Sequence, residues 1–213
     1  MIMMKQHVFA AFAVLFLKQM GFAQSTGTFT DARDGQTYKT ISFQESTTGK
    51  TVTWMAQNLN YKVDGSYAYE YKENNRNELG LLYTWEAAKK ACPSGWHVPT
   101  DNEWATLVHQ FGGMDMAGEA LKSVKSWNED GNGNNSSGFD ALAGGHRRPD
   151  GTYVAQGFLG IFWTSSISTS VDKAWAWNFH YGGPPSSNKQ NLKKAFRWDN
   201  DVAGGYSVRL VRD

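Results

Sequence analysis

The stretch from Leu79 to Phe111, LGLLYTWEAAKKACPSGWHVPTDNEWATLVHQF, predicts two helices separated by a rigid joint. In its first half, Trp85, Ala88 and Cys92 are three and four residues apart, which places them on one face of an α-helix. Pro93 cannot continue that helix, because proline lacks a backbone N–H and its ring clashes with the preceding turn. We therefore expect the first helix to end just before Pro93.

The second half of this stretch contains a strong signal for a new helix. Pro93 and Pro99 each bias the preceding residue towards extended backbone, so a second helix has to begin afresh. Thr100 and Glu103 have the spacing of a capping box, in which each side chain accepts a hydrogen bond from the backbone N–H of the other residue. The apolar side chains that follow lie on one stripe of the expected helix: Trp104, Leu107, Val108 and Phe111.

Six segments are spread through the chain in a defined order. They are FTDARDGQTYKT (29–40), WMAQNLNY (54–61), LLYTW (81–85), ACPSGWHVPT (91–100), GFDALAGG (138–145) and GYSVR (205–209). Together they resemble the Fibrobacter succinogenes major paralogous domain family. The resemblance implies a secreted or surface protein with a C-type-lectin-like α+β fold, distantly similar to the formylglycine-generating-enzyme group. It implies no particular activity, because none is established for the family.

The chain has a single cysteine, Cys92. Members of the resembled family often have a second cysteine near the end of the last strand, where this chain has Leu210, so that disulfide cannot form here. A lone cysteine in an exported protein is either buried and inert or available for an intermolecular bond. We expect a buried thiol, because the helix spacing places it beside Trp85 and Ala88.

The chain divides into three predicted segments. Residues 1–23 have the pattern of a signal peptide, with Lys5 ahead of an uncharged run and small residues near Ala23. That run is shorter than the roughly 20 residues that a membrane-spanning helix needs. Residues 24–36 are polar and predict a loose leader, and residues 37–213 predict one domain of the resembled family. We therefore expect an exported protein, secreted or held in the cell envelope, with no membrane span.

The charge balance argues against a nucleic-acid partner. The chain carries a formal net charge of +1, and loss of residues 1–23 would remove Lys5 and Lys18 and no acidic residue, which changes the charge to −1. The nearest approach to a basic cluster is Arg147 with Arg148, whereas nucleic-acid binders carry a basic patch or stripe. With 40% hydrophobic residues in 213, the chain can build a substantial single core.

Strand patterns precede and follow the two helices. Residues 38–43 and 51–55 flank a polar turn and predict a hairpin. Residues 66–71 place three tyrosines at alternate positions, which we interpret as packing, with a sugar platform as the alternative. Five short patterns separated by turns follow in the last third: residues 152–156, 160–165, 173–179, 194–198 and 206–211. Together with the resemblance, these patterns predict an α+β, C-type-lectin-like fold with two main helices packed on short antiparallel strands and long loops.

The sequence offers no convincing catalytic group. It lacks a Gly-x-Ser-x-Gly elbow, and Cys92 lies in an apolar setting that suppresses its thiolate. His109, His146 and His180 lack the spacing of zinc ligands, and we interpret His97, between two prolines, as structural. Enzymes of the formylglycine-generating group depend on reactive cysteines, so such an enzyme is the third choice. No cofactor is expected.

The residues after Arg197 give the sharpest hypothesis for a binding site. C-type lectins hold calcium partly through a Trp-Asn-Asp element before the final strand, and this chain has a similar group in Trp198, Asp199, Asn200 and Asp201. The order differs, and the Glu-Pro-Asn or Gln-Pro-Asp triplet of those sites is missing. A plain turn therefore accounts for these residues, and calcium binding is the weaker alternative.

The loop over residues 128–135 is the second part of that hypothesis. Asp130 and Asn132 alternate as in an EF-hand, but the sixth position is Asn135 instead of glycine, and the twelfth is Ala141 instead of glutamate, which excludes an EF-hand. We expect this loop to meet residues 198–201 on one side of the domain. The expected ligand-binding residues are Trp198, Asp199, Asn200, Asp201, Asp130 and Asn132.

The expected function is that of an exported, non-catalytic module that binds glycan. The alternative is a structural or adhesive surface protein that binds another protein. A glycan binder should expose aromatic rings flanked by amides and carboxylates, whereas a protein binder should expose a contiguous apolar patch.

Overall fold

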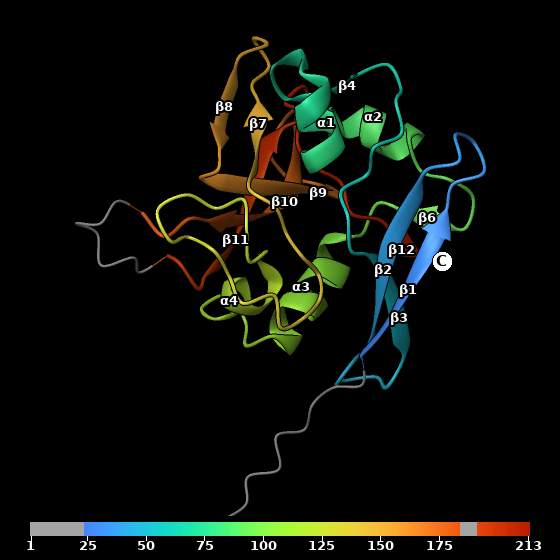
Figure 1. The fold of residues 1–213 in the computed structure, drawn as a ribbon, viewed down its shortest axis with the longest axis vertical. Coiled ribbons are helices and arrows are strands. Elements are labelled where there is room, and N and C mark those ends of the chain that lie inside the picture. Colours follow the sequence, from blue (N-terminus) through green and yellow to red (C-terminus); the bar gives the residue numbers. More distant parts are fainter. Residues whose placement is uncertain (1–23, 184–190) are drawn as a thin grey trace, which may run out of the picture.

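The structure is a computed structural model that describes residues 24–183 and 191–213. The predicted signal peptide, residues 1–23, lies outside the described residues. Figure 1 shows a sheet that contains β1, β2 and β3 on one side and a sheet that contains β9, β10 and β11 on the other. Helices α3 and α4 lie towards one end of the molecule, and α1 and α2 lie towards the other. This arrangement confirms the predicted α+β class.

Short strands and short helices make up the described chain. In chain order they are β1 (Gln24–Thr30), β2 (Thr37–Gln44), β3 (Thr51–Met55), β4 (Ser66–Tyr67), the 3₁₀ helix η1 (Tyr69–Tyr71), α1 (Glu73–Leu79), β5 (Leu82–Tyr83), α2 (Trp85–Lys90), β6 (Trp96–His97), α3 (Asp101–Gln110), α4 (Ala117–Leu121), β7 (Gly144–Arg147), β8 (Tyr153–Gln156), β9 (Leu159–Ile167), β10 (Lys173–His180), β11 (Ala195–Asp201) and β12 (Val211–Arg212). The first sheet has the order β1-β2-β3-β12-β6, the second has the order β11-β10-β9-β7-β8, and β4 pairs with β5. All pairs are antiparallel except β7 with β9, which is parallel.

Helices α2 and α3 form where the sequence predicts them. The Thr84 hydroxyl caps α2, and Thr100 and Glu103 form the predicted capping box at the start of α3. Trp104 of α3 is fully buried and packs edge-on against Trp54 of the first sheet and Phe139 of a loop. Helix α3 thus fixes the apolar core between the two sheets.

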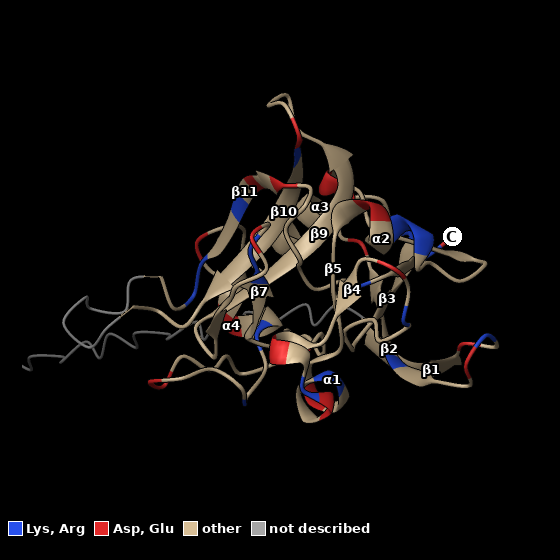
Figure 2. Ribbon diagram, turned by 90° about the horizontal axis from the view of Figure 1, so that it is seen from above, with Lys and Arg blue, Asp and Glu red and all other residues tan. Residues whose placement is uncertain are grey.

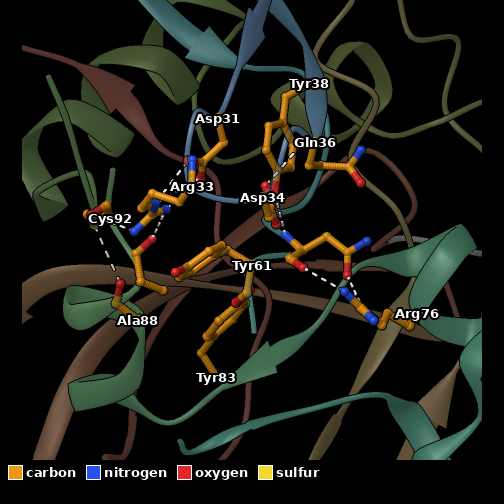
Figure 3. A network of polar contacts seen from close by, with 12 residues as sticks. Asp31, Arg33, Asp34, Gln36, Tyr38, Tyr61, Arg76, Tyr83, Ala88 and Cys92 are labelled. Carbon is orange, nitrogen blue, oxygen red and sulfur yellow. Dashed lines mark hydrogen bonds and ion pairs between the residues drawn. The ribbon is translucent and has the colours of Figure 1, made fainter. Parts of the chain in front are cut away.

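Residues 24–36 are not a loose leader, which corrects the sequence prediction. Residues 24–30 form β1, which pairs with β2 in a continuous antiparallel register. The Arg33 side chain follows, and it donates to Asp31 and to the carbonyl oxygens of Ala91 and Cys92 at the end of α2 (Figure 3). The segment is polar because β1 is a solvent-exposed edge strand, but its backbone bonds make it part of the domain.

A buried arginine near the C-terminus holds several loops together. Arg209 is fully buried and donates to the backbone oxygens of Met55, Phe139 and Asp140 and to the side-chain oxygen of Asn58. Burial lowers the pKa of its guanidinium to about 9. A cation in such a place is tolerated only when hydrogen bonds compensate for the lost water, so these four acceptors are fixed in position.

Candidate ligand-binding site

Residues 198–201, which were expected to bind sugar, lie in the edge strand β11. Trp198 pairs with Ala176 of β10, and Asp199 pairs with Trp175. Because successive side chains of a strand point to opposite faces, Trp198 and Asn200 lie on one face of the sheet, and Asp199 and Asp201 lie on the other. The structure therefore does not bring these four side chains together around one ligand.

The two faces of β11 also differ in how far their side chains are engaged. The Trp198 ring is 43% exposed and packs edge-on against the ring of His180, with ring centres 5.2 Å apart. On the opposite face, the Asp199 carboxylate accepts from the hydroxyls of Ser170 at 2.7 Å and Ser168 at 3.0 Å. These hydrogen bonds hold the pKa of Asp199 below its usual value. Asp199 therefore stabilises the turn that contains Ser168 and Ser170, whereas the Trp198 ring remains accessible to a ligand.

The loop that contains Asp130 and Asn132 is held by a buried lysine. The Lys122 ammonium is fully buried and donates to the carbonyl oxygens of Gly131 and His180. The Asn132 side-chain oxygen accepts from the backbone N–H of Trp127 at 3.2 Å. The loop thus lies near the end of β10, and the Asn132 side chain is engaged inside the loop.

Neither a metal cluster nor a membrane helix is found within the described ranges. Over residues 24–183 and 191–213, no three His, Cys, Asp or Glu side chains are placed so that they could share a metal ion. In the same part of the chain, no helix has the length and apolar character that a membrane span requires. Figure 2 shows acidic and basic residues interspersed along the ribbon, with both signs on α1.

A hollow in the protein surface lies away from β11, between the first sheet and α1. It is lined by residues from the segments 36–39, 56–60, 76–80, 125–126 and 140–142 and has a volume of about 590 Å³. We call it the amide pocket after the Gln and Asn residues among its lining: Gln36, Gln57, Asn58, Asn60 and Asn77. Sequence reasoning missed this site.

One wall of the amide pocket is fixed by a chain of hydrogen bonds from β2 to α1. The buried Tyr38 hydroxyl accepts from the backbone N–H of Asn60 at 3.1 Å. The Asn60 side-chain oxygen in turn accepts from Nε of Arg76 at 2.9 Å. Figure 3 shows Tyr38, Gln36 and Arg76 on neighbouring segments around this contact. These bonds hold the start of β2 and the helix α1 at a constant separation.

The back of the amide pocket is fixed by Asn58, whose amide is fully used by the protein. Its nitrogen donates to the carbonyl oxygen of Leu79 at 2.8 Å, and its oxygen accepts from Nε of the buried Arg209 at 2.7 Å. Beside it, the Gln57 side-chain oxygen accepts from the backbone N–H of Lys39 at 2.7 Å. The amide of Gln57 therefore presents its nitrogen, rather than its oxygen, as the free hydrogen-bonding group.

Two pocket residues have strained backbones. Ser126 and Asp140 have φ angles of 77° and 57°, in the left-handed region that side chains other than glycine rarely adopt. The Asp140 carbonyl oxygen is held there by Arg209, at 2.7 Å from a guanidinium nitrogen. Strain of this kind costs about 1–3 kcal/mol per residue and gathers at ligand-binding sites.

The lining of the amide pocket includes exposed polar groups and charges of both signs. Lys39, Asn77, Glu78 and Lys125 are exposed and line it, and the half-buried Asp140 lies deeper. Such a site can donate hydrogen bonds through ammonium and amide nitrogens and accept them through carboxylate and amide oxygens.

The single cysteine is not part of this pocket. Cys92 is partly buried, rather than fully buried as expected, and its thiol donates to the carbonyl oxygen of Ala88 at 3.5 Å. Burial raises the pKa of this thiol to about 11, which keeps it protonated at neutral pH.

Comparison with known proteins gives a family but no named relative. No curated protein and no solved structure matches the chain. The family model described as the Fibrobacter succinogenes major domain matches residues 37–212, well over half of the 213-residue chain. The chain therefore belongs to the Fibrobacter succinogenes major domain family, as the six sequence segments indicate.

Proposed function

We propose that this protein is an exported, non-catalytic module that binds carbohydrate in the amide pocket. The observation that carries the proposal is the combination of volume and lining. A volume of about 590 Å³ lies within the roughly 300–1,000 Å³ range of small-ligand sites. A wall of amides with charged groups of both signs suits a ligand whose every hydroxyl both donates and accepts.

The lining distinguishes carbohydrate from other ligand classes. Purely apolar ligands need an apolar wall, and protein partners favour a contiguous apolar patch. The large apolar side chains that are exposed in the described chain lie on several different elements: Tyr71 at η1, Met114 and Met116 before α4, Val124, Phe158, Ile167, Val171 and Trp198. This distribution favours carbohydrate over an adhesive contact with another protein.

The proposal that the protein is non-catalytic is supported by two potential nucleophiles, the Ser126 hydroxyl in the pocket and the Cys92 thiol outside it, neither of which is activated. In the pocket, the Ser126 hydroxyl accepts from the backbone N–H of Ala143 at 3.0 Å, and no base is paired with it among the described residues. The protonated Cys92 thiol lacks the reactivity on which formylglycine-generating enzymes depend. A C-type-lectin-like fold is part of the same proposal, supported by the sheet that β12 shares with β1, β2 and β3.

A matched pair of substitutions on α1 tests the pocket. Asn77 lines the pocket, whereas Asn74 is exposed on the same helix and does not line it. Replacing either asparagine with alanine makes the same chemical change at an exposed helical position. On an array of neutral oligosaccharides, Asn77→Ala should weaken binding about five-fold, the equivalent of one hydrogen bond of about 1 kcal/mol. Asn74→Ala should bind as the unaltered protein does.

The same array distinguishes binding in the pocket from binding at β11, and it tests whether binding depends on calcium. If Trp198→Ala abolishes binding and Asn77→Ala does not, the carbohydrate site is the exposed face of β11, and the pocket proposal is wrong. Binding that disappears with a chelator and returns with calcium would assign calcium a place in the site. Absence of binding to every neutral oligosaccharide on the array would refute the proposal for this ligand class.

A further inference from the structure

We propose a second ligand site, which binds the carboxylate of an acidic saccharide, at Arg147 and the tyrosines around it. This inference rests on the proposed carbohydrate function and adds a substrate class to it. We call the site the tyrosine–arginine patch, formed by Tyr67, Tyr71, Arg147 and Tyr153. None of these residues lines the amide pocket.

Strand pairing brings the patch together. Arg147 of β7 lies opposite Tyr153 of β8, so both side chains point to the same face of the sheet. The Arg147 guanidinium lies over the Tyr67 ring, 4.2 Å from its centre. The Tyr71 ring packs edge-on against Tyr153, with ring centres 5.3 Å apart. One cation is therefore surrounded by three aromatic rings.

Two polar atoms of the patch lack partners. Nε of Arg147 and the Tyr153 hydroxyl are both buried and have no hydrogen-bond partner in the part of the chain that the structure describes. Another nitrogen of the Arg147 guanidinium donates to the Arg148 carbonyl oxygen, at 3.4 Å, and the polar groups next to Arg147 are the Tyr71 and Tyr153 hydroxyls. Within the described ranges no carboxylate forms an ion pair with Arg147. A buried polar atom without a partner is costly, so an acceptor is missing at this place.

A carboxylate has the shape of the missing acceptor. Its two oxygens match the parallel N–H groups of a guanidinium, and such charge-assisted bonds are stronger than neutral ones. The Tyr153 hydroxyl can donate to the same group. One planar anion therefore satisfies both buried atoms.

Tyr71 forms the cover of this site. Its ring is 70% exposed, yet Glu70 and Tyr71 both have left-handed backbones, with φ angles of 51° and 57°. Two such residues in succession are a strained backbone conformation for side chains other than glycine. Because the unpartnered atoms of Arg147 and Tyr153 are buried, a ligand reaches them when the Tyr71 ring moves aside. The displaced ring then offers its face to the apolar side of a sugar.

The position of the patch favours an oligosaccharide over a small anion. Tyr71 lies just before the first residue of α1, and Asn77 and Gly80 at the other end of α1 line the amide pocket. A helix of this length spans roughly 10 Å. A saccharide that repeats its units can therefore place one unit in the pocket and the carboxylate of another on the patch.

The test compares acidic oligosaccharides with their own methyl esters, which have the same shape and no charge. Trigalacturonate and trimannuronate, each with its ester, are titrated calorimetrically into the protein. We expect at least one acid to bind ten-fold more tightly than its ester. Arg147→Gln should remove this preference, whereas Lys90→Gln, the same change of charge at an exposed residue of α2, should keep it within two-fold.

A second variant covers the case in which Arg147→Gln does not fold. Tyr153→Phe removes only the hydroxyl and should weaken binding of the acid several-fold while the ester binds unchanged. Equal affinity of acid and ester in the unaltered protein, or an acid preference that survives these variants, overturns the inference. A peptide ending in a free carboxylate that competes as well as the saccharide overturns the assignment to saccharides.

The outcome also separates this inference from the proposed function. If neutral saccharides bind in an Asn77-dependent way and acids are not preferred, the amide pocket is supported as a carbohydrate site and the tyrosine–arginine patch is refuted as a carboxylate site. If the preference for acids depends on Arg147 and binding does not depend on Asn77, the patch is supported as a carboxylate site and the pocket is refuted as a carbohydrate site.

Discussion

Replacing the buried Lys122 with methionine should change how the stability of the protein varies with pH. The Lys122 ammonium is fully buried, donates to the carbonyl oxygens of Gly131 and His180, and lies 4.9 Å from the centre of the Trp127 ring. Burial lowers the pKa of this amine from 10.5 to about 7, although Glu119 opposes the effect. Methionine fills a similar volume without a charge.

Whether stability rises or falls with pH depends on how many protons the folded and unfolded states bind. In the unfolded chain the amine keeps its proton up to about pH 10.4, whereas in the folded protein it loses the proton above about pH 7. Between these values the unfolded state binds more protons, so the stability contributed by Lys122 rises with pH. The limiting slope is about 1.4 kcal/mol per pH unit, and the total from pH 7 to pH 9 is about 2.3 kcal/mol, because the amine is half protonated at pH 7.

Urea unfolding between pH 5 and pH 9, followed by tryptophan fluorescence, measures this term. The difference in free energy of unfolding between the unaltered protein and Lys122→Met should be constant below pH 6. It should then change by about 2.7 kcal/mol in favour of the unaltered protein by pH 9, of which about 2.3 kcal/mol falls between pH 7 and pH 9. Burial and the neighbouring Lys122 lower the pKa of His180, so the change is read between pH 7 and pH 9, above the ordinary titration range of histidine. Groups that do not interact with Lys122 titrate in the same way in both proteins and cancel in the difference.

Lys90→Met provides the control, because Lys90 is exposed at the end of α2. Its difference from the unaltered protein should not vary from pH 7 to pH 9. A flat difference for Lys122→Met over the same range would refute the lowered pKa and, with it, a neutral amine in the folded protein.

Three further predictions concern single residues. Thr100→Ala should lower the free energy of unfolding by about 1 kcal/mol, because the capping box of α3 is lost; chemical denaturation that shows no loss would place the start of the helix elsewhere. Cys92 should react with a thiol reagent much faster in denaturant than in the native protein, and equal rates would contradict the protonated, partly buried thiol. Trp198→Ala should cost about 1 kcal/mol in thermal unfolding, because roughly half of the ring packs on His180 and Phe196; a loss of several kcal/mol would make this residue part of the core.

The helices that the sequence predicts correctly are those with local signals. Helix α3 begins at a capping box and buries Trp104, Leu107 and Val108 on one stripe, so all of its determinants lie within ten residues or so of chain. Helix α2 ends at Lys90, shortly before Pro93, which cannot continue a helix, and this stop signal needs no distant partner. Such patterns predict structure well because the residues that interact are close together in the sequence.

The elements that the sequence does not predict depend on distant partners. Helix α1, ENNRNEL, has one buried residue, Leu79, and no apolar stripe. It is held from outside, by Asn58 at the carbonyl oxygen of Leu79 and by Asn60 at the side chain of Arg76. Strand β1 likewise depends on the free edge of β2. Neither contact can be inferred from the residues within these segments.

The two candidate sites differ in the kind of sequence signal that could reveal them. Asp199 and Trp198 are adjacent in the sequence, and adjacency suggested a shared ligand; in an extended strand, adjacency places them on opposite faces instead. The amide pocket has no such motif. Its walls come from segments that are far apart in the chain, and three of them lie within the stretches that carry the family resemblance: 29–40, 54–61 and 138–145.

Arg209 explains why those stretches meet. It comes from a fourth such segment, GYSVR at residues 205–209, and its buried guanidinium needs acceptors from several loops at once. It takes them from Met55 and Asn58 in one loop and from Phe139 and Asp140 in another. Both loops border the amide pocket, and one of them is held in a strained conformation at Asp140. The shape of the pocket therefore depends on an arginine that is not among its lining residues, which is why a motif made of contacting residues does not reveal it.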